Sequence, residues 1–197
     1  MIFGHFIIKK YRKYKGQGIG TRFVVVGIPL FPVQSFYFLE NNRSIEIDLH
    51  WKHAVKIYVI VISLIYLLIK GLTRDYYDQS FENSVLYTLI FNALIYFLLD
   101  PYTKRDRQIR ELLSKAVYIN ALPKFLGNEM AYNVQKSFIQ KYGGGWKDAI
   151  KNNTYQQDEL PLLFAIITYE VYLYKSDKNQ LLFEKLFTEY KKYERIE

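Results

Sequence analysis

The chain has 197 residues, with 27 lysines and arginines against 19 aspartates and glutamates, a formal net charge of +8, and no cysteine. A chain of this length can bury a sizeable core, and its 50% hydrophobic content excludes an intrinsically disordered protein. The absence of cysteine excludes disulfides, thiol catalysis, iron–sulfur clusters and cysteine-based zinc sites.

The first region, residues 1–53, combines a basic segment with a small β element of about three strands. Glycines at positions 16, 18 and 20 indicate a turn before the first strand. Residues 22–39 are rich in β-branched and aromatic side chains and are interrupted by glycine and proline, which predicts two extended segments. Residues 44–51 alternate apolar and polar side chains, a pattern typical of a half-buried strand.

The basic segment lies before those strands. Five positive side chains fall within residues 9–15: Lys9, Lys10, Arg12, Lys13 and Lys15. Such a run is attracted to anionic lipid head groups or, with its tyrosines, to nucleic acid; it can also be only a charged flank. Lipid is the more natural partner because apolar segments long enough to span a membrane follow, and nucleic acid is the less natural one.

One set of side chains in this region deserves a test as a metal site. Glu46, Asp48 and His50 fall on one face of the predicted strand, and carboxylates and imidazole are common ligands of divalent metals. The solvated face of an alternating strand explains the same pattern. These residues are therefore only a weak metal candidate, and we predict no cofactor.

Residues 54–101 predict a transmembrane helical hairpin. Residues 54–72 have lysines only near the two ends, and residues 83–99 have no charge. At about 1.5 Å per residue, these helices span about 28 Å and 25 Å, close to a hydrocarbon core of about 30 Å. The alternative is a pair of buried helices in a soluble all-α protein, but the near absence of polar positions argues against an amphipathic surface helix.

Charged flanks give the hairpin an orientation. Residues 1–56 carry nine basic and three acidic residues, residues 57–99 carry two and three, and residues 100–151 carry ten and five. The positive-inside rule therefore predicts a bacterial inner-membrane protein with both termini in the cytoplasm. Four further side chains are expected at the lipid surface beside the basic run: Trp51, Tyr102, Lys104 and Arg105.

Residues 102–197 predict a cytoplasmic α-helical domain. Helices are expected over residues 104–122, 128–142 and 158–175, with a last helix capped by Asp177. The glycines at 143–145 end the second of these helices and indicate a hinge or a tight crossing between helices. The complete prediction is a membrane-anchored, mainly α protein: a two-helix transmembrane hairpin with a small N-terminal β element and a C-terminal cytoplasmic helical domain.

An enzyme is not expected. All three histidines precede the hairpin, so the helical domain has neither histidine nor cysteine for acid–base or nucleophilic work. We expect a non-enzymatic protein whose helical domain binds an unidentified protein partner, of an accessory or toxin-immunity type.

The alternative is a defence effector that oligomerises and forms a pore or perturbs the membrane. Ser63 and Asn92 bear on the choice, because both lie near the middle of their segments. They can hydrogen-bond across the hairpin, join subunits of a homo-oligomer, or line a polar path. One polar residue per helix is few for a hydrophilic pore, which favours the anchor.

Overall fold

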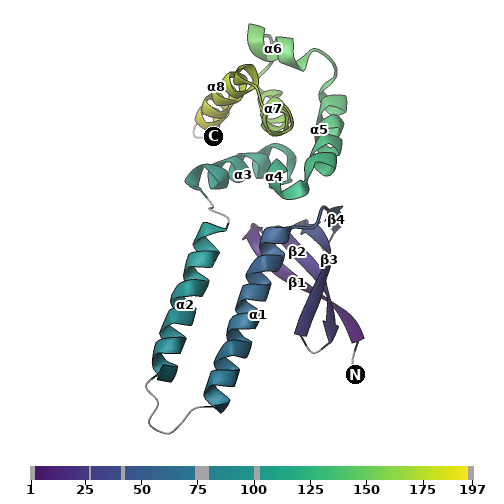
Figure 1. Ribbon diagram of the computed structural model, residues 1–197. Coiled ribbons are helices and arrows are strands. Elements are labelled where there is room, and N and C mark those ends of the chain that lie inside the picture. The colour runs from purple at the N-terminus through teal and green to yellow at the C-terminus, as the bar shows by residue number, and fades with distance from the viewer. Residues whose placement is uncertain (1–2, 27, 41–42, 74–79, 100–102, 195–197) are drawn as a thin grey trace. The chain divides into compact units, whose positions relative to one another are not determined.

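The computed structural model describes residues 3–26, 28–40, 43–73, 80–99 and 103–194 (Figure 1). The chain is mainly helical with a small antiparallel sheet at the N-terminus. It forms two compact units. The first comprises residues 1–11, 20–35 and 49–102, and the second comprises residues 12–19, 36–48 and 103–197.

The sheet has four strands in the order β1-β2-β3-β4. They are β1 (Phe3–Tyr14), β2 (Gln17–Val26), β3 (Ile28–Phe38) and β4 (Ser44–Ile47). The basic run lies in β1 except for Lys15, which is in the following turn, so placing the run before the first strand was wrong. The connecting turn contains Lys15 (φ 42°) and Gly16 (φ 80°), and two consecutive positive φ angles suit the tight turn of a hairpin. The other two glycines lie within β2.

The apolar segments form α1 (Trp51–Leu72) and α2 (Ser80–Leu98), which contact each other. Each begins three residues before the predicted span of 54–72 or 83–99. The strand predicted over residues 44–51 was too long, because β4 ends at Ile47 and Trp51 is the first residue of α1. The cause is the cap: His50 Nδ1 accepts a hydrogen bond from the His53 backbone N–H at 3.3 Å and starts the helix.

Within the first unit, the sheet packs against the N-terminal part of α1 (Figure 1). Phe23 of β2 is buried with Ala54 and Ile57 of α1. Ile8, Tyr58 and Val61 pack around this cluster. The sheet therefore covers α1 only as far as its third turn, and the side chains that follow are mostly exposed.

The second unit is built around α7 (Leu160–Leu173), in which residues 163–170 are all buried. The surrounding helices are α3 (Lys104–Val117), α4 (Pro123–Leu126), α5 (Asn128–Tyr142), α6 (Trp146–Asn152) and α8 (Asp177–Tyr193). Contacts join α7 to α8, α5, α3 and α4. Burial raises the pKa of Tyr169 in this core, so its hydroxyl remains a neutral donor to the Ala121 carbonyl at 2.9 Å.

The predicted helix over 128–142 is confirmed. The last helix is present, but its cap is Ser176 and not Asp177, which is its first residue. Two further helices differ from their predicted bounds. The helix predicted over 104–122 ends at Val117, because Tyr118 adopts a left-handed conformation (φ 59°) and α4 then starts at Pro123. The predicted helix over 158–175 is shorter at each end. The glycines at 143–145 are followed by α6, a helix that the sequence analysis did not predict.

A buried arginine joins strand ends to helices inside the second unit. Arg110 of α3 is 1% exposed and donates hydrogen bonds to the Asn120 carbonyl, Asn120 Oδ1, the Arg12 carbonyl and the Tyr37 hydroxyl at 2.6–3.3 Å. Asn120 in turn donates to the Tyr14 carbonyl at 3.0 Å. The ends of β1 and β3 are therefore part of the helical unit.

Candidate functional site

The apolar hairpin is the first candidate site. Both helices are long and apolar enough to cross a membrane, by length and composition, and only 6% of each apolar window is buried. Asn92 Nδ2 donates to Ser63 Oγ at 2.8 Å and to the Thr88 carbonyl at 2.8 Å. Ser63 and Asn92 therefore form a hydrogen bond across the hairpin, one of the three roles that the sequence allows for them.

The residues expected at a lipid surface have different surroundings. Trp51 is 63% exposed, and Lys13 and Lys15 are exposed. The Arg12 carbonyl is bound by Arg110. Tyr102 lies outside the described residues, as do the side chains of Lys9 and Lys10.

The two basic residues at the start of α3 also differ from each other. Lys104 is exposed. Arg105 forms an ion pair with Glu184, and its guanidinium carbon lies 5.4 Å and 5.7 Å from the ring centroids of Phe183 and Phe187. Arg105 therefore contacts α8 within the helical unit.

The weak metal candidate is not assembled. Among the described residues, no group of three or more His, Asp or Glu side chains is placed to hold a metal ion. Asp48 lies instead against Gly127 at the start of α5, and His50 caps α1. The strand that was expected to align Glu46 with these two residues ends before either of them.

A buried polar cluster between the sheet and α1 was not predicted from the sequence. Thr21 Oγ1 lies 3.0 Å from Ser35 Oγ and 2.9 Å from His53 Nδ1, and all three side chains are buried. The His50 backbone N–H donates to Ser35 Oγ at 3.0 Å. Thr21 and Ser35 are fully buried, so this threonine–histidine contact joins the sheet to α1 and is closed to a substrate. In the sequence, the only sign of this cluster is that His50 and His53 lie three residues apart at the start of α1.

Lys56 completes the same region of the first unit. It is 6% exposed, and its Nζ lies 5.1 Å from the ring centroid of Tyr11 and 4.3 Å from that of Tyr96. A cation over aromatic faces is attracted by the ring quadrupole. Lys56 therefore links β1, α1 and α2.

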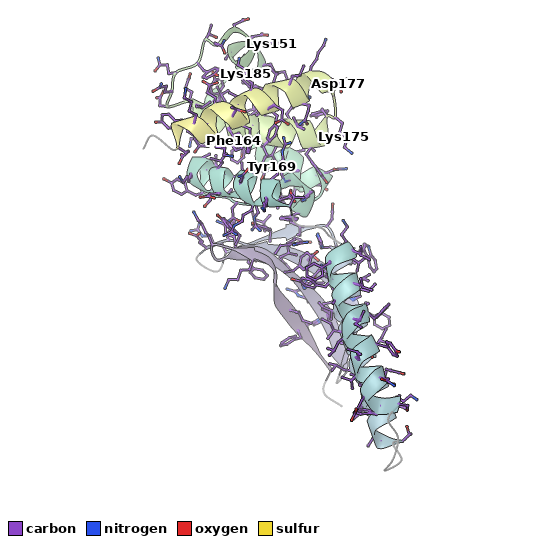
Figure 2. The ribbon with its side chains drawn as sticks, turned by 90° about the vertical axis from the view of Figure 1, so that its left-hand side faces the viewer. Lys151, Phe164, Tyr169, Lys175, Asp177 and Lys185 are labelled. Carbon is purple, nitrogen blue, oxygen red and sulfur yellow. The ribbon has the colours of Figure 1, made fainter. Side chains whose placement is uncertain are left out.

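The second candidate site is a cleft of about 620 Å³ in the helical unit. It is lined by α5, α6, α7 and the segment that starts α8, and Figure 2 shows the side chains of this unit, with Lys151 labelled on α6. Its lining includes three aromatic and three basic residues: Tyr132, Trp146, Tyr174, Lys147, Lys151 and Lys178.

One carboxylate lies in this cleft. Glu170 is 5% exposed and accepts hydrogen bonds from Lys147 Nζ at 2.5 Å and Gln135 Nε2 at 2.7 Å, one at each oxygen. A buried carboxylate needs such partners, because burial of an unpaired charge is strongly unfavourable. The sequence does not predict this cleft, because its residues come from four separate segments.

The fold and these two sites define a class only: a mainly helical protein with a small β-sheet, an apolar helical hairpin and a helical unit with a basic cleft. The chain matches no protein-family model, and no curated protein or solved structure matches it.

Proposed function

We propose that the protein is a non-enzymatic protein of the bacterial inner membrane, in which α1 and α2 form a transmembrane anchor. The observation that carries the proposal is the exposure of apolar side chains on both helices. Ile62, Leu64 and Leu68 of α1 are 61–63% exposed, and Phe97 and Leu98 of α2 are 72–73% exposed. In water this surface is unfavourable, and in lipid it is solvated. A soluble all-α protein would bury it.

The polar pair in the hairpin supports an anchor more than a pore. The Asn92 amide has two N–H donors, and both are used within the hairpin, on Ser63 and on the Thr88 carbonyl. A pore lining instead needs polar groups that are available to water or ions. The interhelical bond contributes about 0.6–2 kcal/mol in a membrane, which favours a closed pair of helices.

The helical unit is the part that we propose binds a protein partner in the cytoplasm, in an accessory or toxin-immunity role. Basic residues are in excess both before and after the hairpin in the sequence, and both of these flanks lie at the same side of the membrane, which supports this orientation. Tyr118 is 83% exposed and Leu181 is 70% exposed. Tyrosine is enriched in protein interfaces relative to the rest of the surface.

The topology is testable by cysteine labelling, and the natural chain needs no cysteine removed. Ser80→Cys at the start of α2 should react with an impermeant maleimide in intact spheroplasts. Ser137→Cys, exposed on α5, should react only after lysis. The proposed topology is contradicted if both variants label equally in intact spheroplasts, or if neither variant labels before lysis.

Membrane potential separates the anchor from the pore-forming effector. Overexpression of the natural chain should leave the inner-membrane potential unchanged, and so should overexpression of Asn92→Leu. If the natural chain depolarises the membrane and Asn92→Leu does not, the anchor proposal is wrong and the pore-forming effector is favoured.

A further inference from the structure

The cleft in the helical unit has a net positive charge. Lys147, Lys151 and Lys178 contribute three positive charges and Glu170 one negative charge, a sum of +2. Asp148, outside the cleft lining, lies 3.8 Å from Lys151, but both side chains are more than half exposed and such a pair contributes little. A phosphate monoester carries a charge of about −1.5 to −2 at pH 7, which matches this sum.

Glu170 positions one of the lysines. Its bond with Lys147 Nζ uses one of the three N–H donors of the ammonium group, and the Lys147 side chain is still 46% exposed. The same Nζ lies 5.2 Å from the ring centroid of Trp146. Lys147 is therefore held in place by a buried carboxylate and an aromatic ring, with donors left for a ligand.

The start of α8 contributes Lys178 to the cleft. Ser176 caps the helix, with its Oγ accepting from the Asn179 backbone N–H at 3.2 Å, and Lys178 lies in the first turn. The N-terminus of a helix of 17 residues carries a partial positive charge. Asp177 in the same turn does not line the cleft, but its negative charge offsets this partial charge, so the positive contribution of α8 to the cleft is Lys178.

The remaining walls are apolar and aromatic. Tyr132 and Tyr174 are 46% and 51% exposed, and Ile139 and Leu182 also line the cleft. Pockets for small organic molecules are of this size and combine apolar walls with a few polar groups. Inorganic phosphate alone would leave these walls uncovered.

We propose that this cleft binds an organic phosphate, with the phosphate group at Lys147, Lys151 and Lys178 and an apolar or planar body between Tyr132 and Tyr174. The same chemistry occurs in a soluble phosphate ester and in the head group of an anionic phospholipid. The cleft is formed without residues of α1 and α2, so the proposed phosphate site can be tested separately from the proposed transmembrane anchor.

Trp146 provides the readout, because Trp51→Phe leaves it as the single tryptophan of the chain. The full-length variant is placed in phosphatidylcholine nanodiscs and titrated with adenosine monophosphate, and with adenosine as the ligand without phosphate. A second set of nanodiscs contains phosphatidic acid in place of part of the phosphatidylcholine. A saturable change in Trp146 emission is expected with one of the two phosphates and not with adenosine.

The double variant Lys151→Ala, Lys178→Ala should raise the dissociation constant at least about tenfold, since each lysine contributes a charge-assisted hydrogen bond. The matched control Lys136→Ala, Lys141→Ala removes the same charge from exposed positions of α5 and should leave binding unchanged. A response to adenosine monophosphate assigns the soluble source, and a response only to phosphatidic acid assigns the lipid. No saturable response to either, or equal binding by both double variants, overturns the proposal.

Discussion

At the residue scale, Arg110 is a buried polar side chain of the second unit that makes four hydrogen bonds. Its charge is buried, and its four hydrogen bonds all go to neutral oxygens of Asn120, Arg12 and Tyr37. A guanidinium has rigidly arranged donors, so one side chain satisfies acceptors from β1, β3 and α3's following loop at once. An apolar residue at this position would leave those acceptors without their donor.

Arg110→Met should lower the free energy of unfolding of the second unit by about 3 kcal/mol or more, because several buried acceptors lose a charge-assisted hydrogen bond. The measurement is urea unfolding of the full chain in detergent, followed by Trp146 emission in the Trp51→Phe background. Arg107→Met, an exposed change on the same helix, should stay within about 0.5 kcal/mol of the parent. A similar loss in both variants would refute a special role for Arg110.

Gly127 and Gly144 differ in what their positions require. Gly127 has φ 79° and ψ 168°, a region open essentially only to glycine, and a Cβ atom there would lie 2.1 Å from Asp48 Oδ2. A Cβ atom at Gly144 would meet nothing within 4 Å. The glycines of the loop before α6 are therefore not all needed for the fold.

Gly127→Ala should destabilise the second unit by about 2 kcal/mol or more, from backbone strain and the displaced carboxylate. Gly144→Ala should be neutral or stabilising by up to about 1 kcal/mol, because alanine restricts the unfolded chain. The same Trp146 unfolding measurement compares them. Equal effects of the two alanines would contradict the assignment.

At the element scale, α1 has two different surroundings along its length. The sheet packs on it as far as Val61, which is about 15 Å from Trp51 at 1.5 Å per residue. If residues 54–72 of α1 span a membrane, Val61 lies about 10 Å inside the edge of the hydrocarbon core, and the part of the sheet packed there is also in lipid. Alternation along β3 puts Phe31 and Val33 on the same face as Ser35, and they are 67% and 51% exposed.

We therefore expect Phe31 to contact lipid. Phe31→Trp should emit at shorter wavelength and be quenched by brominated phospholipid in nanodiscs, after subtraction of the emission of the parent protein. Gln34→Trp, on the opposite face of β3 by alternation, should be quenched less. Equal quenching of the two tryptophans would contradict the expectation that the face of β3 with Phe31 is the one that contacts lipid.

The elements that sequence patterns predicted best are those whose pattern depends on local spacing. The apolar runs of α1 and α2 and the helix over Asn128–Tyr142 are long enough for their periodicity or composition to decide. The first strand was missed because four positive charges obscured the alternation of β1. The cleft and the Thr21–Ser35–His53 cluster were missed because each brings together residues far apart in sequence, which no local pattern reports.

At the scale of the whole molecule, the β element and the helical domain are not separate compact units, because parts of the β element pack with the helices. The predicted helical domain begins at residue 102, but the second compact unit also contains residues 12–19 and 36–48. Gln17 is one example: its Nε2 donates to the Tyr118 carbonyl at 2.9 Å, and its Oε1 accepts from the Asn120 backbone N–H at 3.0 Å. The helices therefore depend on strand ends that precede the hairpin in the chain.

A fragment of residues 103–197 should consequently unfold at a lower urea concentration than the full chain, followed by the emission of Trp146. Without residues 12–19 and 36–48, Arg110 loses the Arg12 carbonyl and the Tyr37 hydroxyl as acceptors. The loss caused by Arg110→Met should then fall by about half, from about 3 kcal/mol in the full chain to about 1.5 kcal/mol in the fragment, since only the two bonds to Asn120 remain. A fragment as stable as the full chain, with the full Arg110→Met loss, would make residues 103–197 an autonomous domain and the strand ends accessory to it.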